Sequence, residues 1–449
     1  MKNIEKIIAT TILIGLVPGL GSMAAEATDY LAIACLHRNA NQCGAINEKG
    51  QWVIRPDFDT IGDFTPNGLA IASKRRRTGV INVQGQWVLQ PNFDQVKMTT
   101  GIDGLVKVAR GKNCNQTGHL YNLVSVLNQV IKSPEFKEIQ PFGPNHLAGA
   151  QNQEGYWGFI TTAGAWAIEP IFDRVEIFDP NGLAPARRQG ETLWGYINST
   201  GTWAIPPRFD QAFPFDDSIA KVATGEFYGL IDPKGSWVTK TKFASLGDFG
   251  NDGLALAQKE VDGLYGFVNR SGDWVVKPLF QHLHEFGRSG LAAAQQNGLY
   301  GFINRTGQWI IKPTYDNVND FESQTGQAPV EKAGAWGLID RQGKWIVEPK
   351  YLMIISTGES GLMQIFTEER RWGLMDEKGR WVINPVLTAS LYFSENGLSE
   401  ARVGELYGFI NRHGQWVVKP IFQQVGAFRP VLVNPPPAKE SSPSDQAPG

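Results

Sequence analysis

The stretch LYGFINRTGQWIIKPTYDNVNDF, residues 299–321, decides the fold because it nearly recurs along the chain. Close copies begin at Leu264, Ala335 and Leu406. A Gly two positions before a Trp marks ten copies, at Trp52, Trp87, Trp166, Trp203, Trp237, Trp274, Trp309, Trp345, Trp381 and Trp416. Neighbouring marks lie 34–37 residues apart, except for one step of 79. That step fits two periods, and residues 120–155 form a degenerate copy, so we expect about eleven repeats over residues 43–430.

Each copy has the pattern of short antiparallel strands. Apolar residues alternate with others on both sides of the segment Asn304–Gly307, whose composition is that of a hairpin turn. Pro313 lacks an N–H donor, so we expect it to end the second strand. Short apolar segments follow it, which predicts a three- or four-stranded meander for each copy.

One such unit is too small to bury its own apolar face, so neighbouring units must stack. The ten recurrent Trp residues are interpreted as the core of the contacts between units. We therefore predict an all-β tandem array of propeller-like blades, either closed or an open superhelix. A β-solenoid of stacked hairpins is the alternative.

The dipeptides near the start of the copies carry a family resemblance. They read Trp157-Gly158, Trp194-Gly195, Trp336-Gly337 and Trp372-Gly373, with Tyr-Gly at Tyr228, Tyr265, Tyr300 and Tyr407. Together with the Gly-x-Trp mark, they resemble the WG (KWG) repeat family. The resemblance implies an all-β repeat array and no particular activity. The first three copies depart from it, with Cys43-Gly44, Thr78-Gly79 and Tyr121-Asn122 in place of the dipeptide.

Composition and charge limit the partners. Fifty Gly and 26 Pro among 449 residues make about 17%, above the roughly 12% of average proteins, and favour turns over long helices. Lys and Arg number 42 against 44 Asp and Glu, a formal net charge of −2. No global basic field therefore attracts nucleic acid, and we expect no nucleic-acid partner.

The N-terminus has the pattern of an export signal. Residues 1–24 have Lys2 and Lys6 before an apolar run and small residues after it, which predicts a cleaved signal peptide. An uncleaved membrane anchor is the alternative, although the run is shorter than the about 20 residues that span a bilayer. We expect a periplasmic or secreted protein that is not integral to the membrane after cleavage.

The segments outside the repeats are assigned by composition. Residues 25–42 form an N-terminal segment, and residues 431–449 are rich in Pro and Ser, which predicts a disordered tail. In an oxidising compartment Cys35 and Cys43 can form a disulfide, with two unlinked thiols as the alternative. Cys114 is left without a partner.

Two groups of side chains suggest a metal site. Recurring Phe-Asp pairs place Asp59, Asp94, Asp173, Asp210 and Asp316 at one repeat position. They can be interpreted as a ring of carboxylates, but Asx turns to nearby backbone N–H groups explain them better, because later copies lack the Asp. His282 and His284 supply two imidazoles without further ligands, so a surface pair is preferred over a metal site.

No motif for catalysis or cofactor binding is present, so we expect neither catalytic residues nor a cofactor. Lys74, Arg75, Arg76 and Arg77 form the one dense basic run, interpreted either as a partner contact or as a solvated loop. The preferred hypothesis is a non-catalytic binding scaffold for an envelope protein or glycan. A propeller-type enzyme with a central site and a structural spacer are the alternatives.

Overall fold

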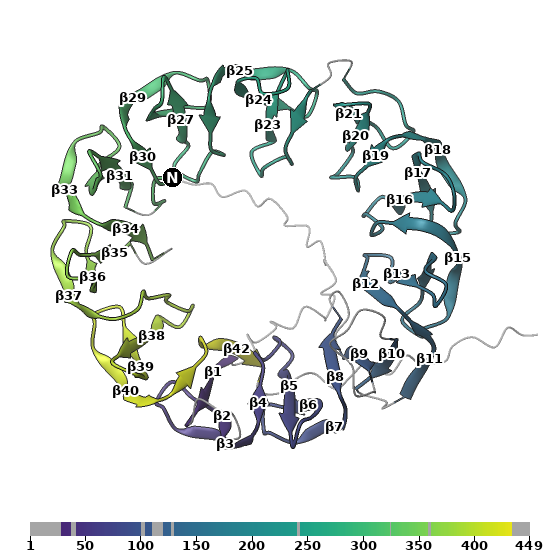
Figure 1. Cartoon of the computed structure of the whole chain (residues 1–449), viewed down its shortest axis with the longest axis horizontal. Helices are drawn as coiled ribbons and strands as arrows, with labels where there is room; N and C mark the ends of the chain where they lie inside the picture. Colours follow the sequence, from purple (N-terminus) through teal and green to yellow (C-terminus); the bar gives the residue numbers. More distant parts are fainter. Residues whose placement is uncertain are drawn as a thin grey trace, which may run out of the picture.

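The computed structural model describes residues 28–36, 42–99, 104–109, 120–126, 130–239, 243–323, 325–357 and 361–432. These residues form ten antiparallel β-sheets that follow one another around a ring (Figure 1). The seven-stranded sheet holds two units that share the long strand β15 (Trp166–Val175), so the ring has eleven units, which we call blades 1 to 11 in chain order. The predicted all-β, propeller-like tandem array is confirmed.

A blade has up to four strands, from an inner strand near the ring axis to an outer strand on the circumference (Figure 1). The inner strands are β41 (Gln424–Val425), continued by β42 (Arg429–Leu432), then β4 (Thr60–Ile61), β8 (Gln95–Met98), β12 (Glu138–Phe142), the end of β15, β19 (Gln211–Ala212), β22 (Ser245–Leu246), β26 (His282–Leu283), β30 (Asn317–Val318) and β34 (Met353–Ser356). The second strands are β1 (Thr28–Cys35), β5 (Leu69–Lys74), β9 (Leu105–Ala109), β13 (Ala148–Gln151), β16 (Leu183–Arg188), β20 (Ala220–Thr224), β23 (Leu254–Gln258), β27 (Ala292–Gln296), β31 (Ala328–Lys332), β35 (Met363–Phe366) and β38 (Leu398–Val403).

The third strands begin at or near the hallmark dipeptide. They are β2 (Cys43–Ile46), β6 (Arg77–Asn82), β10 (Tyr121–Ser125), β14 (Trp157–Ile160), β17 (Trp194–Asn198), β21 (Phe227–Ile231), β24 (Tyr265–Asn269), β28 (Leu299–Ile303), β32 (Ala335–Ile339), β36 (Trp372–Met375) and β39 (Leu406–Asn411). The outer strands are β3 (Trp52–Phe58), β7 (Trp87–Phe93), β11 (Val130–Phe136), β15, β18 (Trp203–Phe209), β25 (Trp274–Phe280), β29 (Trp309–Tyr315), β33 (Trp345–Tyr351), β37 (Trp381–Leu387) and β40 (Trp416–Phe422). None of the described residues forms a helix with the length and hydropathy that crossing a bilayer needs.

The sequence copy and the blade are offset by two strands. The copy that begins at Leu299 supplies the third and outer strands of blade 8, and then the inner and second strands of blade 9. Each copy is therefore shared between two blades, so the chain itself links every blade to the next. The predicted meander is present in each blade, but its boundaries fall inside the sequence copies.

This offset leaves blade 1 to be completed by both ends of the array. Strand β1 pairs with β2 on one edge and with β41 and β42 on the other, where Thr28 lies opposite Leu432 and Ala34 opposite Val425. Figure 1 shows the last strands beside the first ones, so the ring closes here. The array thus extends beyond residues 43–430 at both ends. Neither extension carries the Gly-x-Trp mark, because that mark belongs to the third and outer strands.

The Trp at the start of an outer strand contacts the preceding blade. In nine cases the ring of a recurrent Trp meets an aromatic ring of the preceding blade, edge to face, with centroids 5.4–6.1 Å apart. Such pairs contribute about 0.5–1.5 kcal/mol beyond their buried area. The Trp residues are nevertheless only half-buried, and Trp237, Trp381 and Trp416 are 47%, 37% and 37% exposed. The sequence suggested that the Trp residues form the core of the blade contacts. Seven of the ten pack against the core clusters while partly exposed, so they lie at the edge of that core.

The same contact closes the ring. Trp52 of blade 1 meets Phe422 of blade 11 at 5.7 Å, as Trp87 of blade 2 meets Phe58 of blade 1 at 5.5 Å. A Cβ added at Gly50 would lie 2.9 Å from Val418 of blade 11. Blade 1 therefore packs against the last blade as an internal blade packs against its neighbour.

Candidate functional site

The basic run forms the tip of a hairpin in blade 2. Lys74, the last residue of β5, pairs with Arg77, the first residue of β6, so Arg75 and Arg76 make a two-residue turn. Their φ angles are 53° and 62°, in the left-handed region that L-residues avoid. A turn with two positive φ angles matches the twist of a hairpin and normally takes Asn-Gly, as at Asn297–Gly298 in blade 8. Two arginines here occupy a conformation that costs free energy.

The ends of this turn are held by acidic side chains. The Lys74 ammonium lies 2.5 Å from an Asp57 carboxylate oxygen, and the Arg77 guanidinium lies 2.8 Å from Asp94. The side chains of Arg75 and Arg76 are exposed, and neither makes an ion pair with another described residue. In the basic run, Lys74 and Arg77 are thus held in ion pairs, whereas Arg75 and Arg76 form none with the described residues. Sequence reasoning missed Asp57, because it lies 17 residues away on the outer strand of blade 1.

The Asp of the Phe-Asp pair holds the next hairpin turn. A carboxylate oxygen of Asp59 accepts a hydrogen bond from the Arg76 backbone N–H at 2.9 Å. The same bond recurs in other blades, at Asp173 with Gly190 (3.1 Å), Asp210 with Gly225 (2.6 Å), Asp316 with Ala333 (2.6 Å) and, through its amide oxygen, Gln281 with Gly298 (2.9 Å). The structural interpretation holds, but the Asx turn was wrong, because the donor lies 15–17 residues further along.

The two histidines lie on and just after the inner strand of blade 8. His284 Nδ1 is 3.2 Å from an Asp320 carboxylate oxygen in blade 9, and this hydrogen bond raises the pKa of His284 against the opposing effect of burial. His282 is exposed and stacks near Tyr300. In the described part of the chain, no group of three or more His, Cys, Asp and Glu side chains is placed to hold a metal ion. His284 therefore links blades 8 and 9, whereas His282 contacts its own blade.

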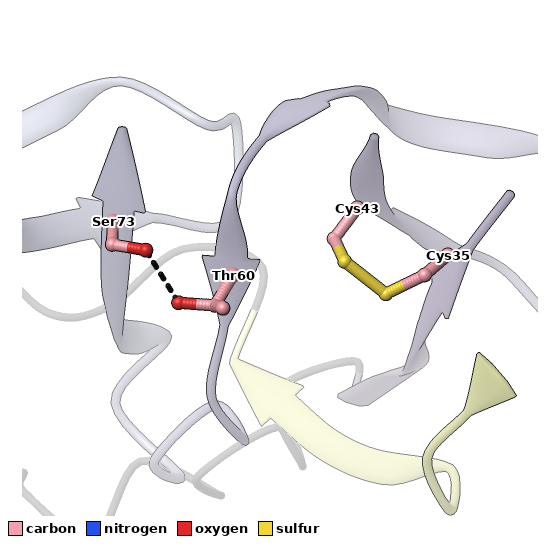
Figure 2. The surroundings of a disulfide bond; sticks show 4 residues. All are labelled: Cys35, Cys43, Thr60 and Ser73. Carbon is pink, nitrogen blue, oxygen red and sulfur yellow. Dashed lines mark hydrogen bonds between the residues drawn. A yellow bond between two sulfur atoms is a disulfide. The ribbon is translucent and has the colours of Figure 1, made fainter. Parts of the chain in front are cut away.

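A disulfide joins Cys35 of β1 to Cys43 of β2, residues that face each other across the antiparallel pair with their Cα atoms 4.1 Å apart (Figure 2). Figure 2 also shows Thr60 of β4 and Ser73 of β5, the inner and second strands of the neighbouring blade 2, whose hydroxyls are 2.6 Å apart. The disulfide holds β1, the strand that completes blade 1, against β2. Cys114, the predicted signal peptide of residues 1–24 and residues 433–449 of the predicted tail lie outside the described residues.

We expect the double variant Cys35→Ser, Cys43→Ser to lose about 2–3 kcal/mol of unfolding free energy in blade 1, since the bond closes a loop of residues eight apart. Urea unfolding of the oxidised wild type and the variant measures this difference. Reductant should lower the midpoint of the wild type and leave that of the variant unchanged. Equal midpoints before reduction would contradict a stabilising role for the bond.

Comparison with solved structures gives distant likenesses. A crystal structure described as the eukaryotic initiation factor is 9% identical, covers 89% of this chain and 98% of its own, and has a TM-score of 0.42. The structure of Kluyveromyces lactis Hsv2p is 10% identical, with coverage of 74% and 97% and a TM-score of 0.27. That of dihydro-heme d1 dehydrogenase NirN is 10% identical, with coverage of 92% and 77% and a TM-score of 0.32. No curated protein matches the sequence.

The model of one family, the WG containing repeat, matches ten segments of the chain. They are residues 44–75, 79–109, 157–191, 194–226, 228–260, 265–300, 300–334, 336–351, 372–407 and 407–429. The degenerate copy at residues 120–155 is not among them, consistent with its missing Gly and Trp. The matched segments cover well over half of the chain, which therefore belongs to the family of proteins with WG containing repeats.

Proposed function

We propose that this protein is a non-catalytic binding scaffold whose ring of blades presents the hairpin of residues 74–77 to an anionic partner, a protein or a glycan. The observation that carries the proposal is the turn at Arg75 and Arg76. Residues held in costly backbone conformations concentrate at functional sites, where the surrounding structure maintains them. Asn-Gly would form the same turn without that cost, as it does in blade 8.

The charge distribution around the turn supports the same proposal. Asp57, Asp59 and Asp94 bind the base of the hairpin, which leaves the two central guanidiniums exposed at its tip. A guanidinium forms paired hydrogen bonds with carboxylate, sulfate or phosphate groups. Because the whole chain has a formal charge of −2, this attraction is local to the hairpin.

We propose that the protein acts in the periplasm or outside the cell. The signal-like pattern of residues 1–24 and the disulfide of blade 1 support this location, since structural disulfides persist in oxidising compartments. The envelope offers both anionic glycans and acidic proteins. Fractionation of cells that express the full chain tests the location.

Replacing Arg75 with Asn and Arg76 with Gly separates binding from stability. We expect the variant to be about 1–2 kcal/mol more stable, because the left-handed conformations no longer oppose a side chain. Its affinity for the anionic partner should fall about tenfold, since two exposed ion contacts contribute up to about 1 kcal/mol each. Heparin serves as the glycan probe and poly-glutamate as the acidic polypeptide probe, with affinities measured by calorimetry near physiological salt.

The turn of blade 8 provides the matched control. The variant Asn297→Arg, Gly298→Arg places the same two side chains on the same kind of turn, so it should lose stability without gaining the partner contact. A wild type that binds neither probe would contradict the proposed contact. So would a blade 2 variant that binds as tightly as the wild type.

A further inference from the structure

A recurring Phe in the loop after the inner strand behaves differently in two neighbouring blades. It is buried, with 1–6% exposure, at Phe64, Phe142, Phe178, Phe321 and Phe428. Phe249 of blade 7 and Phe286 of blade 8 are only half-buried, as is Phe393 of blade 11. In blades 7 and 8 the next residue is Gly, at Gly250 and Gly287, as it also is after the buried Phe142 of blade 4.

A cavity of about 550 Å³ lies between these two loops. Phe249, Phe286, Phe267 and Leu254 form its apolar lining, and Phe267 packs against Phe286 with ring centroids 4.7 Å apart. Small-molecule sites in proteins commonly occupy about 300–1,000 Å³. The cavity therefore has the size and the aromatic lining of a ligand site, at a place where most other blades have a buried ring.

The polar groups of the cavity are of both signs. Asp252 and Glu285 supply carboxylates, and Arg288 and Arg305 supply guanidiniums. The Arg305 guanidinium lies over the Phe286 ring at 5.7 Å and 3.5 Å from Asp252, whose other carboxylate oxygen accepts a hydrogen bond from Leu254 N–H at 3.2 Å. These contacts fix donors and acceptors around the aromatic surface. The two carboxylates and the two guanidiniums together give the lining of the cavity no net charge.

We propose that this cavity binds a single uncharged sugar ring. The C–H face of a pyranose is apolar and stacks on aromatic rings, while its hydroxyls both donate and accept hydrogen bonds. An anion would face Asp252 and Glu285, and a purely apolar ligand would desolvate four charged groups without compensation. The site lies in blades 7 and 8, separate from the hairpin of blade 2, and goes beyond the anionic contact proposed above.

Gly287 allows the cavity to be filled without disturbing the core. Its φ is not positive, and an added Cβ would meet nothing closer than the Ser289 hydroxyl at 3.7 Å. The variant Gly287→Leu therefore adds bulk to the cavity wall. Ser394→Leu makes the corresponding change in blade 11 and is its control. Arg305→Ala removes one polar group, with Arg341→Ala in the turn of blade 9 as its control.

The test is saturation-transfer NMR and calorimetry on the full chain with the methyl glycosides of glucose, galactose, mannose and N-acetylglucosamine. We expect at least one glycoside to bind the wild type. Its affinity for Gly287→Leu should be at least tenfold lower, and its affinity for the two control variants should equal that for the wild type. The blade 2 variant Arg75→Asn, Arg76→Gly should keep the sugar affinity, which separates this site from the anionic contact. The proposal is overturned if no glycoside binds the wild type, or if Gly287→Leu and Arg305→Ala both bind as the wild type does.

Discussion

Replacing Gly158 with Ala is expected to cost about 3 kcal/mol or more of unfolding free energy, although the change adds only one methyl group. The added Cβ would lie 2.4 Å from the carbonyl oxygen of Ile168 and 2.8 Å from the backbone of Glu169 and Pro170. These atoms belong to β15, the outer strand that crosses over the hallmark glycine. Backbone cannot rotate away as a side chain can, so strand pairing must distort or break.

Gly182 is the control because its Ala variant measures only the free energy needed to place a side chain on a residue with positive φ. Its φ is 76°, and nothing lies within 4 Å of an added Cβ, so Gly182→Ala should lose only about 1 kcal/mol. Urea unfolding of both variants, followed by tryptophan fluorescence, measures the two losses. Equal losses would show that crowding under the outer strand does not make the hallmark glycine necessary.

The role of the hallmark glycine could be predicted from sequence because the glycine and the Trp recur together. An added Cβ would lie 2.9 Å from the Trp203 ring at Gly195 and 2.5 Å from the Trp237 ring at Gly229, so the glycine and the Trp that recur in sequence meet in the blade. A feature that repeats at fixed spacing reveals its partner, since both must recur with the same period. The meander of short strands followed from the same argument, but the offset of two strands between copy and blade did not.

Features that occur once could not be predicted in this way. The closure of the ring depends on β1 and β42, which carry no repeat mark and pair Thr28 with Leu432 across nearly the whole chain. The donor to Asp59 lies in the next hairpin turn, and the spacing of 17 residues does not show which way that turn faces. The cavity between Phe249 and Phe286 is lined by loops of two neighbouring blades, and no sequence pattern shows how those loops lie relative to each other.

Replacing Val431 with Asp is expected to open the ring at its closing strand. Val431 is 2% exposed and packs in one core cluster with Leu31 and Phe64. The new carboxylate would be buried without a partner, and Asp29 is its direct neighbour across the strand pair, so like charges would also repel. We expect a loss of about 3 kcal/mol in the local stability of β1, which corresponds to about a hundredfold faster amide exchange there.

Hydrogen exchange resolved by peptide can distinguish local opening from general unfolding. Because each blade contacts only its neighbours, the loss should be confined to blade 1 and its two contacts, and β24 in blade 7 should exchange as before. Small-angle scattering should show a larger radius for the variant. Val417→Asp, at a position on β40 that is 42% exposed, adds the same charge and should change neither measurement. If β1 stayed protected in Val431→Asp, contacts other than its pairing with β42 would have to hold the ring closed.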